Sequence, residues 1–122
     1  MTRLTVRRRD LFHWTCEHGA DAIRRDGMVV KPHLGLSWWT DMDKADRHTR
    51  AACVLTSNTI KCDRMQYRCR AVSFGLLIPW SAYAVDADPA FVETLEQVPG
   101  ADPSRWWVAS EPVPVSSVRY AR

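Results

Sequence analysis

The order of short periodic segments along the chain constrains the fold more than any other feature of this sequence. Residues Leu11 to Thr15 alternate between two faces, and this alternation predicts a β-strand. Glu17 to Asp26 then follows helical spacing, with Ala20 and Ile23 on the inward side, and Gly27 is a residue type that ends helices. The sequence therefore predicts a strand that leads directly into a short helix.

Extended segments dominate the rest of the chain. Alternation or short apolar runs predict strands at Met28 to Val30, Leu36 to Thr40, Gln66 to Phe74, Leu76 to Trp80 and Trp106 to Ala109. In the third of these, one face holds Tyr67, Cys69 and Ala71, and the other holds Arg68, Arg70 and Val72. Pro112 and Pro114 predict extended chain that does not occupy a central strand position with every amide paired.

Two further helices are predicted. The first runs roughly from Lys44 to Leu55 and is capped by Asp41 or Asp43. The second starts at Asp88, because Asp is a favoured N-cap and Pro89 suits the first turn. Its apolar stripe consists of Phe91, Val92, Leu95 and Val98, and Gly100 ends it.

These segments fit one domain that spans residues 1–122. A chain of 122 residues, 46% of them hydrophobic, can bury a single modest core. Strands and helices stop alternating after the second helix, so the fold class is α+β with a mostly antiparallel sheet. We expect a bent or split antiparallel β-sandwich with two or three short helices.

Composition excludes several classes of protein. No stretch of 18 apolar residues is present, so we expect no membrane partner. The basic N-terminus is not followed by an apolar segment, which predicts a cytoplasmic protein with its four cysteines reduced. The spacings of Cys16 with His18 and of Cys62 with Cys69 form no compact zinc motif, so no metal is expected.

Positive charge is unevenly placed along a chain whose net charge is only +3. One cluster consists of Arg3, Arg7, Arg8 and Arg9, and the other of Lys61, Arg64, Arg68 and Arg70. Such clusters suit contact with phosphates, either a pyrophosphate or a nucleic acid, and solvated strand edges are the alternative.

Three places hold residues suited to ligand chemistry. His13 and Thr15 share a strand face and offer ring nitrogens and a hydroxyl to a ribose or an amide, although a buried histidine bonded to backbone is the alternative. Trp38 and Trp39 face opposite ways, so one can stack on a planar ring, or both can fill the core. Glu111 follows an aromatic strand, where its carboxylate can stabilise an oxocarbenium ion or simply be an exposed strand end.

The order of these three places resembles the ADP-ribosyltransferase superfamily. The segment "LFHWTCEHGADAIRRDG" is similar to the opening strand and helix of the family, "LSWWTD" to its second motif and "ASEPVPVSSV" to its third. The order covers most of the chain, and about 30 residues match closely. The resemblance implies NAD as a substrate, and the short length suggests a minimal member such as a phage-encoded one acting in the host cytoplasm.

The resemblance also implies roles for individual residues. His13 and Thr15 would hold the nicotinamide-ribose end of NAD, with Trp14 beside them in the same motif. Trp38, rather than Trp39, would stack on the nicotinamide, with Thr40 in the same motif. Glu111 and His13 would be the catalytic pair, because the carboxylate supports the ribosyl cation as nicotinamide leaves.

Two departures from the family pattern narrow the expected activity. Many members have Tyr where Trp38 stands, and many that modify protein side chains have Glu or Gln where Ala109 stands, which argues against arginine modification. We therefore expect an NAD-dependent mono-ADP-ribosyltransferase whose acceptor, a nucleic acid, a host protein or a small molecule, the sequence does not identify. The alternative is a non-catalytic protein of the same fold that binds a nucleotide, a nucleic acid or a host protein.

Overall fold

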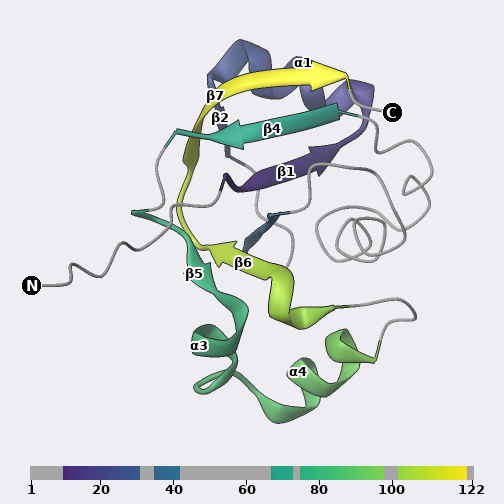
Figure 1. Ribbon diagram of the computed structural model, residues 1–122, viewed down its shortest axis with the longest axis vertical. Helices are drawn as coiled ribbons and strands as arrows, with labels where there is room; N and C mark the ends of the chain where they lie inside the picture. Colours follow the sequence, from purple (N-terminus) through teal and green to yellow (C-terminus); the bar gives the residue numbers. More distant parts are fainter. Residues whose placement is uncertain (1–9, 31–34, 42–66, 73–74, 98–101, 121–122) are drawn as a thin grey trace, which may run out of the picture.

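The computed structural model describes residues 10–30, 35–41, 67–72, 75–97 and 102–120 (Figure 1). The predicted helix at 44–55 lies outside these residues, as do Val98 and Gly100. The arginine cluster before residue 10 and the basic residues Lys61 and Arg64 also lie outside them.

One antiparallel sheet of seven strands organises this single-domain α+β protein. The strands are β1 (Phe12–Thr15), β2 (Met28–Val29), β3 (Ser37–Thr40), β4 (Tyr67–Ala71), β5 (Ile78–Pro79), β6 (Trp106–Ala109) and β7 (Val113–Tyr120). Their order across the sheet is β2-β7-β4-β1-β3-β6-β5. Strands therefore form at the expected places in the predicted antiparallel arrangement, although the one expected at Leu76 to Trp80 is reduced to the two-residue β5.

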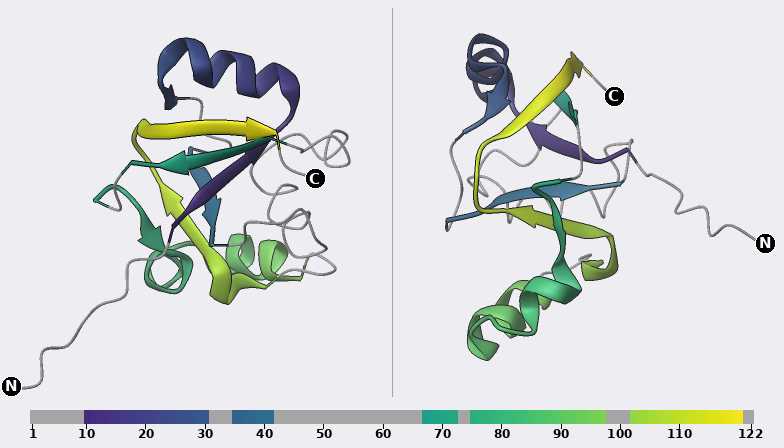
Figure 2. Two further views of the ribbon diagram at one scale, coloured as in Figure 1. Left: turned by 45° about the horizontal axis from the view of Figure 1, so that its top comes forward. Right: turned by 90° about the vertical axis from the view of Figure 1, so that its left-hand side faces the viewer.

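The sheet is bent between β1 and β3 (Figure 2). A single residue pair, Phe12 with Thr40, joins these two strands, whereas four pairs join β1 to β4. We call β2, β7, β4 and β1 the upper half of the sheet, and β3, β6 and β5 the lower half. Helix α1 (Glu17–Asp26) packs on the upper half, and helices α3 (Trp80–Ala84) and α4 (Pro89–Glu96) lie at the lower half (Figures 1 and 2).

Helix α1 forms where the sequence predicts it, and with the predicted inward side. Ala20 and Ile23 are its buried residues. Gly27 adopts a left-handed conformation with φ of 72°, and its N–H donates to the carbonyl of Ile23 at 2.7 Å. Only a residue without a Cβ enters this conformation at little cost, so Gly27 ends the helix and turns the chain into β2.

The described residues form two hydrophobic cores, and the larger one includes residues of β3 and β6 as well as residues of the upper half. The upper core consists of Leu11, Ile23, Val29, Trp39, Cys69, Ala71, Leu77, Ala109 and Val113. The lower core consists of Leu36, Trp38, Trp80, Leu95, Trp106 and Val108. In the lower core the Trp80 indole N–H donates to the Glu96 carboxylate at 2.7 Å, which satisfies the one polar atom of a ring that is only 1% exposed.

Helix α4 begins where the sequence predicts a helix start, whereas the sequence predicts no helix at the position of α3. The Asp88 carboxylate accepts from the backbone N–H of Ala90 at 3.2 Å and caps α4. The apolar run that predicts a strand over Leu76 to Trp80 yields only the two-residue β5, and Trp80 instead opens α3. The reason is tertiary, because the buried Trp80 ring packs against Trp38 and Trp106 of the lower core.

Strand β7 is longer than Pro112 and Pro114 predict, and it lies between two other strands of the sheet. It runs from Val113 to Tyr120 between β2 and β4. Pro114 is tolerated because it lies near the start of the strand, opposite Met28 of the two-residue β2, while the register with β4 begins at Val115. No helix within the described ranges is long and apolar enough to cross a membrane.

Candidate functional site

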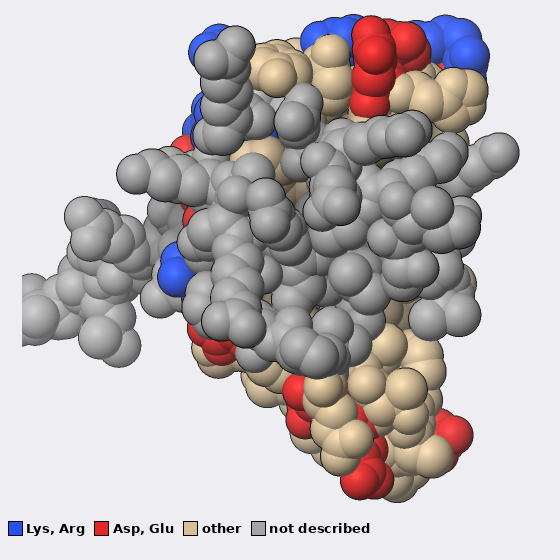
Figure 3. Space-filling model, turned by 90° about the vertical axis from the view of Figure 1, so that its right-hand side faces the viewer, with Lys and Arg blue, Asp and Glu red and all other residues tan. Residues whose placement is uncertain are grey.

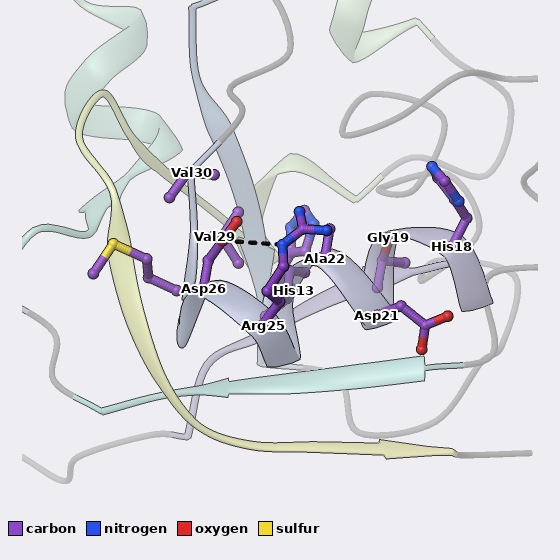
Figure 4. Close-up of a pocket in the computed structure, with 12 residues that line it drawn as sticks. His13, His18, Gly19, Asp21, Ala22, Arg25, Asp26, Val29 and Val30 are labelled. Atoms are coloured by element: carbon purple, nitrogen blue, oxygen red, sulfur yellow. Dashed lines mark hydrogen bonds and ion pairs between the residues drawn. The ribbon is translucent and has the colours of Figure 1, made fainter.

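A cavity of about 530 Å³ lies between β1, α1 and β2 (Figure 4). Its lining residues are His13, Thr15, His18, Gly19, Asp21, Ala22, Ile23, Arg25, Asp26, Met28, Val29 and Val30. His13 and Thr15 reach it together because they are two residues apart on one strand and so share a face. The structure therefore brings these two predicted site residues to one cavity.

His13 has one ring nitrogen bound to the protein and the other open to the cavity. Its Nδ1 lies 2.9 Å from the backbone oxygen of Trp38. A carbonyl oxygen only accepts hydrogen bonds, so in the neutral ring the proton resides on Nδ1 and Nε2 is an acceptor. No buried polar side-chain atom lacks a partner within the described residues, so Nε2 is exposed to the cavity rather than sealed in the core.

The charge state of His13 follows from its burial. Desolvation lowers the pKa of this imidazole below its ordinary value, and the hydrogen bond to Trp38 opposes that shift only in part. The ring is thus neutral at neutral pH, and Nε2 presents a lone pair to a ligand. The hydrogen bond of Nδ1 to the backbone agrees with the alternative interpretation of His13, whereas its contact with a ligand stays a prediction.

Thr15 is fixed by the close approach of α1. A methyl group added at Gly19 would overlap the Thr15 hydroxyl oxygen, and it would also lie 3.2 Å from the Thr15 Cβ. Glycine at this position therefore lets the first turn of the helix pass directly over the end of β1. This contact holds the Thr15 side chain, which is only 6% exposed, beside the cavity.

Charged side chains surround the cavity on the α1 side. Asp21 and Asp26 contribute carboxylates and Arg25 a guanidinium, which pairs with Asp26 at 3.5 Å. His18 lines the same side (Figure 4). Asp21 in turn pairs with Arg24 at 3.6 Å, so both carboxylates on this side are balanced by a guanidinium group. The feature of this wall that selects a ligand is therefore Nε2 of His13, which accepts a hydrogen bond.

The ring of Trp38, the tryptophan expected at the ligand, lies away from His13, and neither Trp38 nor Trp39 lines the cavity. Trp39 is the ring beside His13, with ring centroids 5.5 Å apart, and it belongs to the upper core. Trp38 points to the lower core, where it packs against Trp80 and Trp106. The reason is the strict alternation of β3, because neighbouring residues of a strand face opposite sides.

Three further residues stand apart from the arrangement that the resemblance implies. Trp14 is buried on the face of β1 opposite to His13, and Thr40 is buried on β3 where it pairs with Phe12 and Trp106. Neither lines the cavity. Glu111 is exposed in the turn between β6 and β7, and it is also absent from the cavity lining.

The position of Glu111 relative to the cavity follows from strand register. Val113 pairs with Val29, and both Val29 and Val30 line the cavity. Glu111 precedes Val113 by two residues, which reach about 7 Å at most. The carboxylate therefore belongs to the turn near the β2 end of the cavity, beyond the residues that form its wall.

The α1 residues of the cavity are the part that sequence reasoning missed. The signal was present, because Gly19, Ala22 and Asp26 recur at helical spacing directly after the His13 motif. Within the described ranges no group of three or more His, Cys, Asp or Glu side chains is arranged to hold a metal ion. No protein-family model, no curated protein and no solved structure matches this chain.

Proposed function

We propose that this protein binds NAD through the cavity between β1, α1 and β2 and transfers ADP-ribose to an acceptor. The observation that carries the proposal is the pair formed by His13 and Thr15, which presents one acceptor nitrogen and one hydroxyl in a single cavity. The split antiparallel fold implied by the family resemblance is part of the same proposal. Its support is the sheet that is joined at its middle by one residue pair.

The chemistry of the cavity suits the nicotinamide-ribose end of NAD. Ribose hydroxyls and the carboxamide N–H group both donate hydrogen bonds, and Nε2 of His13 accepts one. The nicotinamide ring of NAD is cationic, and the carboxylates of Asp21 and Asp26 lie in the cavity wall, each already paired with an arginine. A volume of about 530 Å³ lies within the size range of small-molecule sites.

Glu111 is the residue proposed to support bond cleavage. In this step the bond between the ribose C1′ and the nicotinamide nitrogen breaks, and its electron pair leaves with neutral nicotinamide. The carboxylate stabilises the ribosyl oxocarbenium ion until an acceptor nucleophile attacks C1′ and loses its proton. A ribose that extends from His13 along β2 would approach the turn that holds Glu111, since Val30 lines that end of the cavity.

A second function, ligand binding without turnover, is favoured by one observation. Glu111 is exposed and does not line the cavity with His13. A protein that retains the His13 and Thr15 contacts but lacks a carboxylate at the ribose would bind the ligand without cleaving it. Binding and cleavage therefore have to be measured separately.

The test combines calorimetric titration of NAD with measurement of nicotinamide release. The wild type, His13→Leu, Glu111→Gln and the control Glu93→Gln are compared, because Glu93 is an exposed carboxylate on α4 away from the cavity. If the protein transfers ADP-ribose, His13→Leu should weaken NAD binding at least about tenfold, because a hydrogen bond in a desolvated site is lost. Glu111→Gln should bind NAD normally and lower release by about a hundredfold or more.

The results distinguish ADP-ribosyl transfer, binding without turnover, and the absence of both functions. Binding that depends on His13, together with equally negligible release from wild type and Glu111→Gln in a cell lysate, supports the binding function. Failure of the wild type to bind NAD contradicts ADP-ribosyl transfer and NAD binding without turnover alike. Incubation of the wild type with labelled NAD and lysate then shows whether protein, DNA, RNA or a small molecule receives the label.

A further inference from the structure

A second hollow lies on the face of the upper half that points away from α1. It has a volume of about 420 Å³. Its lining residues are Asp10, Phe12, Arg68, Arg70, Ser116, Ser117 and Arg119, and we call it the arginine-serine hollow. Arg68 and Arg70 point to this side because Cys69 and Ala71, which alternate with them on β4, are buried in the upper core.

The register of β4 and β7 concentrates positive charge in the hollow. Arg68 and Arg119 are direct cross-strand partners, and like charges in this position destabilise a sheet unless an anion lies between them. Arg70 is the partner of Ser117, one step along the same face. The Asp10 carboxylate pairs with Arg70 at 2.8 Å, and both side chains are about half exposed. Among the described residues that line the hollow, three carry a guanidinium group and one carries a carboxylate.

A β-bulge brings two hydroxyl groups into the same hollow. Arg70 pairs with Ser117 and the adjacent Ala71 pairs with Val115, so Ser116 is the extra residue of β7. Neighbouring residues of a regular strand face opposite sides, yet Ser116 and Ser117 both line the hollow. The bulge therefore adds hydrogen-bond donors where the arginines supply charge.

One arginine is held in position by an aromatic ring. The guanidinium carbon of Arg68 lies 4.8 Å from the centroid of the Phe12 ring. Stacking on a ring face restricts the guanidinium plane and leaves its N–H groups at the edge, where they can donate. Guanidinium and hydroxyl donors in one concave site match the oxygens of a phosphate group.

The distribution of charge along the chain favours a long polyanion over a small anion as the ligand of this hollow. Residues 75–104 contain five acidic residues and no Lys or Arg, so the positive charge resides in the rest of the chain. The end formed by α3 and α4 accordingly displays acidic and no basic side chains on the face seen in Figure 3. This separation of charge attracts a polyanion to the upper half of the sheet and repels it from the lower half.

We propose that the arginine-serine hollow binds the phosphates of a nucleic acid strand. This inference does not rest on the proposed NAD function, because the hollow and the cavity lie on opposite faces of the upper half. Its contacts are to phosphate and not to base edges, so we expect little sequence preference. Affinity should fall steeply with salt, as it does when arginines displace condensed counterions.

The test measures binding of a fluorescein-labelled single-stranded oligodeoxynucleotide of about 20 nucleotides by anisotropy over a range of salt concentrations. Arg119→Gln is compared with Arg24→Gln, which removes the same charge from the opposite face, where Arg24 lies over the Tyr67 ring. We expect Arg119→Gln to weaken binding about tenfold and to lower the salt slope by about 0.7, the value for one phosphate contact on a single strand. Arg24→Gln should stay within about twofold of wild type.

Ser117→Ala provides a test at constant charge, and we expect about threefold weaker binding from the lost hydroxyl donor. Circular dichroism confirms that each variant is folded. Equal losses for Arg119→Gln and Arg24→Gln would mean that only net charge matters, and would overturn the proposal. Inorganic pyrophosphate is then added as a competitor at low-millimolar concentration. If it displaces the oligonucleotide completely and binds with the same affinity per phosphate group, the hollow is a site for small phosphates, and the proposal of a nucleic acid partner is wrong.

Discussion

The buried imidazole of His13 makes the stability of this protein depend on pH in a direction that the structure fixes. Burial lowers the pKa of His13 in the folded state, whereas the unfolded chain titrates at the ordinary value of 6.5. Below that value the unfolded state binds a proton that the folded state does not bind. The unfolding free energy is therefore greatest above pH 6.5 and decreases as the pH falls, until the folded-state pKa is reached.

The size of this decrease follows from the linkage relation. While the folded ring stays neutral and the unfolded ring is protonated, each pH unit removes up to about 1.4 kcal/mol. Between about pH 7.5 and about pH 5.5 the His13 contribution is therefore at most about 1.4 kcal/mol, and it reaches this limit if the folded ring stays neutral throughout. This is a substantial part of the stability of a small domain.

The assay is urea denaturation at these two pH values, with the wild type compared to His13→Gln. Glutamine retains a donor for the Trp38 carbonyl and does not titrate, so the variant should lose less stability than the wild type on acidification, by up to about 1.4 kcal/mol. His18→Gln is the control for removal of an exposed histidine, and it should retain the wild-type difference because His13 is present. An equal loss on acidification in wild type and His13→Gln would refute the reasoning.

Three further predictions concern single residues elsewhere in the structure. Gly19→Ala should displace the Thr15 hydroxyl and weaken NAD binding about tenfold while the protein stays folded, and unchanged affinity in calorimetry would contradict this role of Gly19. Burial raises the pKa of Cys69 to about 12, so peptide mapping after iodoacetamide treatment at about pH 8 should find this thiol alkylated only in urea, and native labelling would contradict it. Asp88→Ala should lower the unfolding free energy by about 1 kcal/mol through loss of the α4 cap, whereas Asp88→Asn should not, as measured by urea denaturation.

Local patterns predicted the first strand, the first helix and its end, because these are decided by residues near in sequence. The strand forms where Leu11 to Thr15 alternate, although all five residues are buried, and the helical spacing of Ala20 and Ile23 agrees with their burial. Gly27 and Asp88 perform the backbone roles typical of their residue types. His13 and Thr15 could be placed on one face for the same local reason.

Other parts of the site could not be predicted, because they depend on pairing between distant segments. Which of Trp38 and Trp39 faces His13 is decided by which side of β3 the lower core covers. The position of Glu111 depends on the pairing of β2 with β7. The bulge at Ser116 leaves no mark in the sequence, since only the register with β4 reveals the extra residue.

One register pair and the hydrogen bond from His13 to Trp38 join β1 to β3, and the two halves of the sheet on either side cannot be separated by cutting the chain. The backbone enters the upper half with β1, passes to the lower half at β3, returns with β4, descends again through β5 and β6, and finishes above with β7. Neither part is a continuous stretch, so no truncation yields one without the other. Folding has to bring remote segments together before either core closes, which favours slow, all-or-none assembly despite the small size.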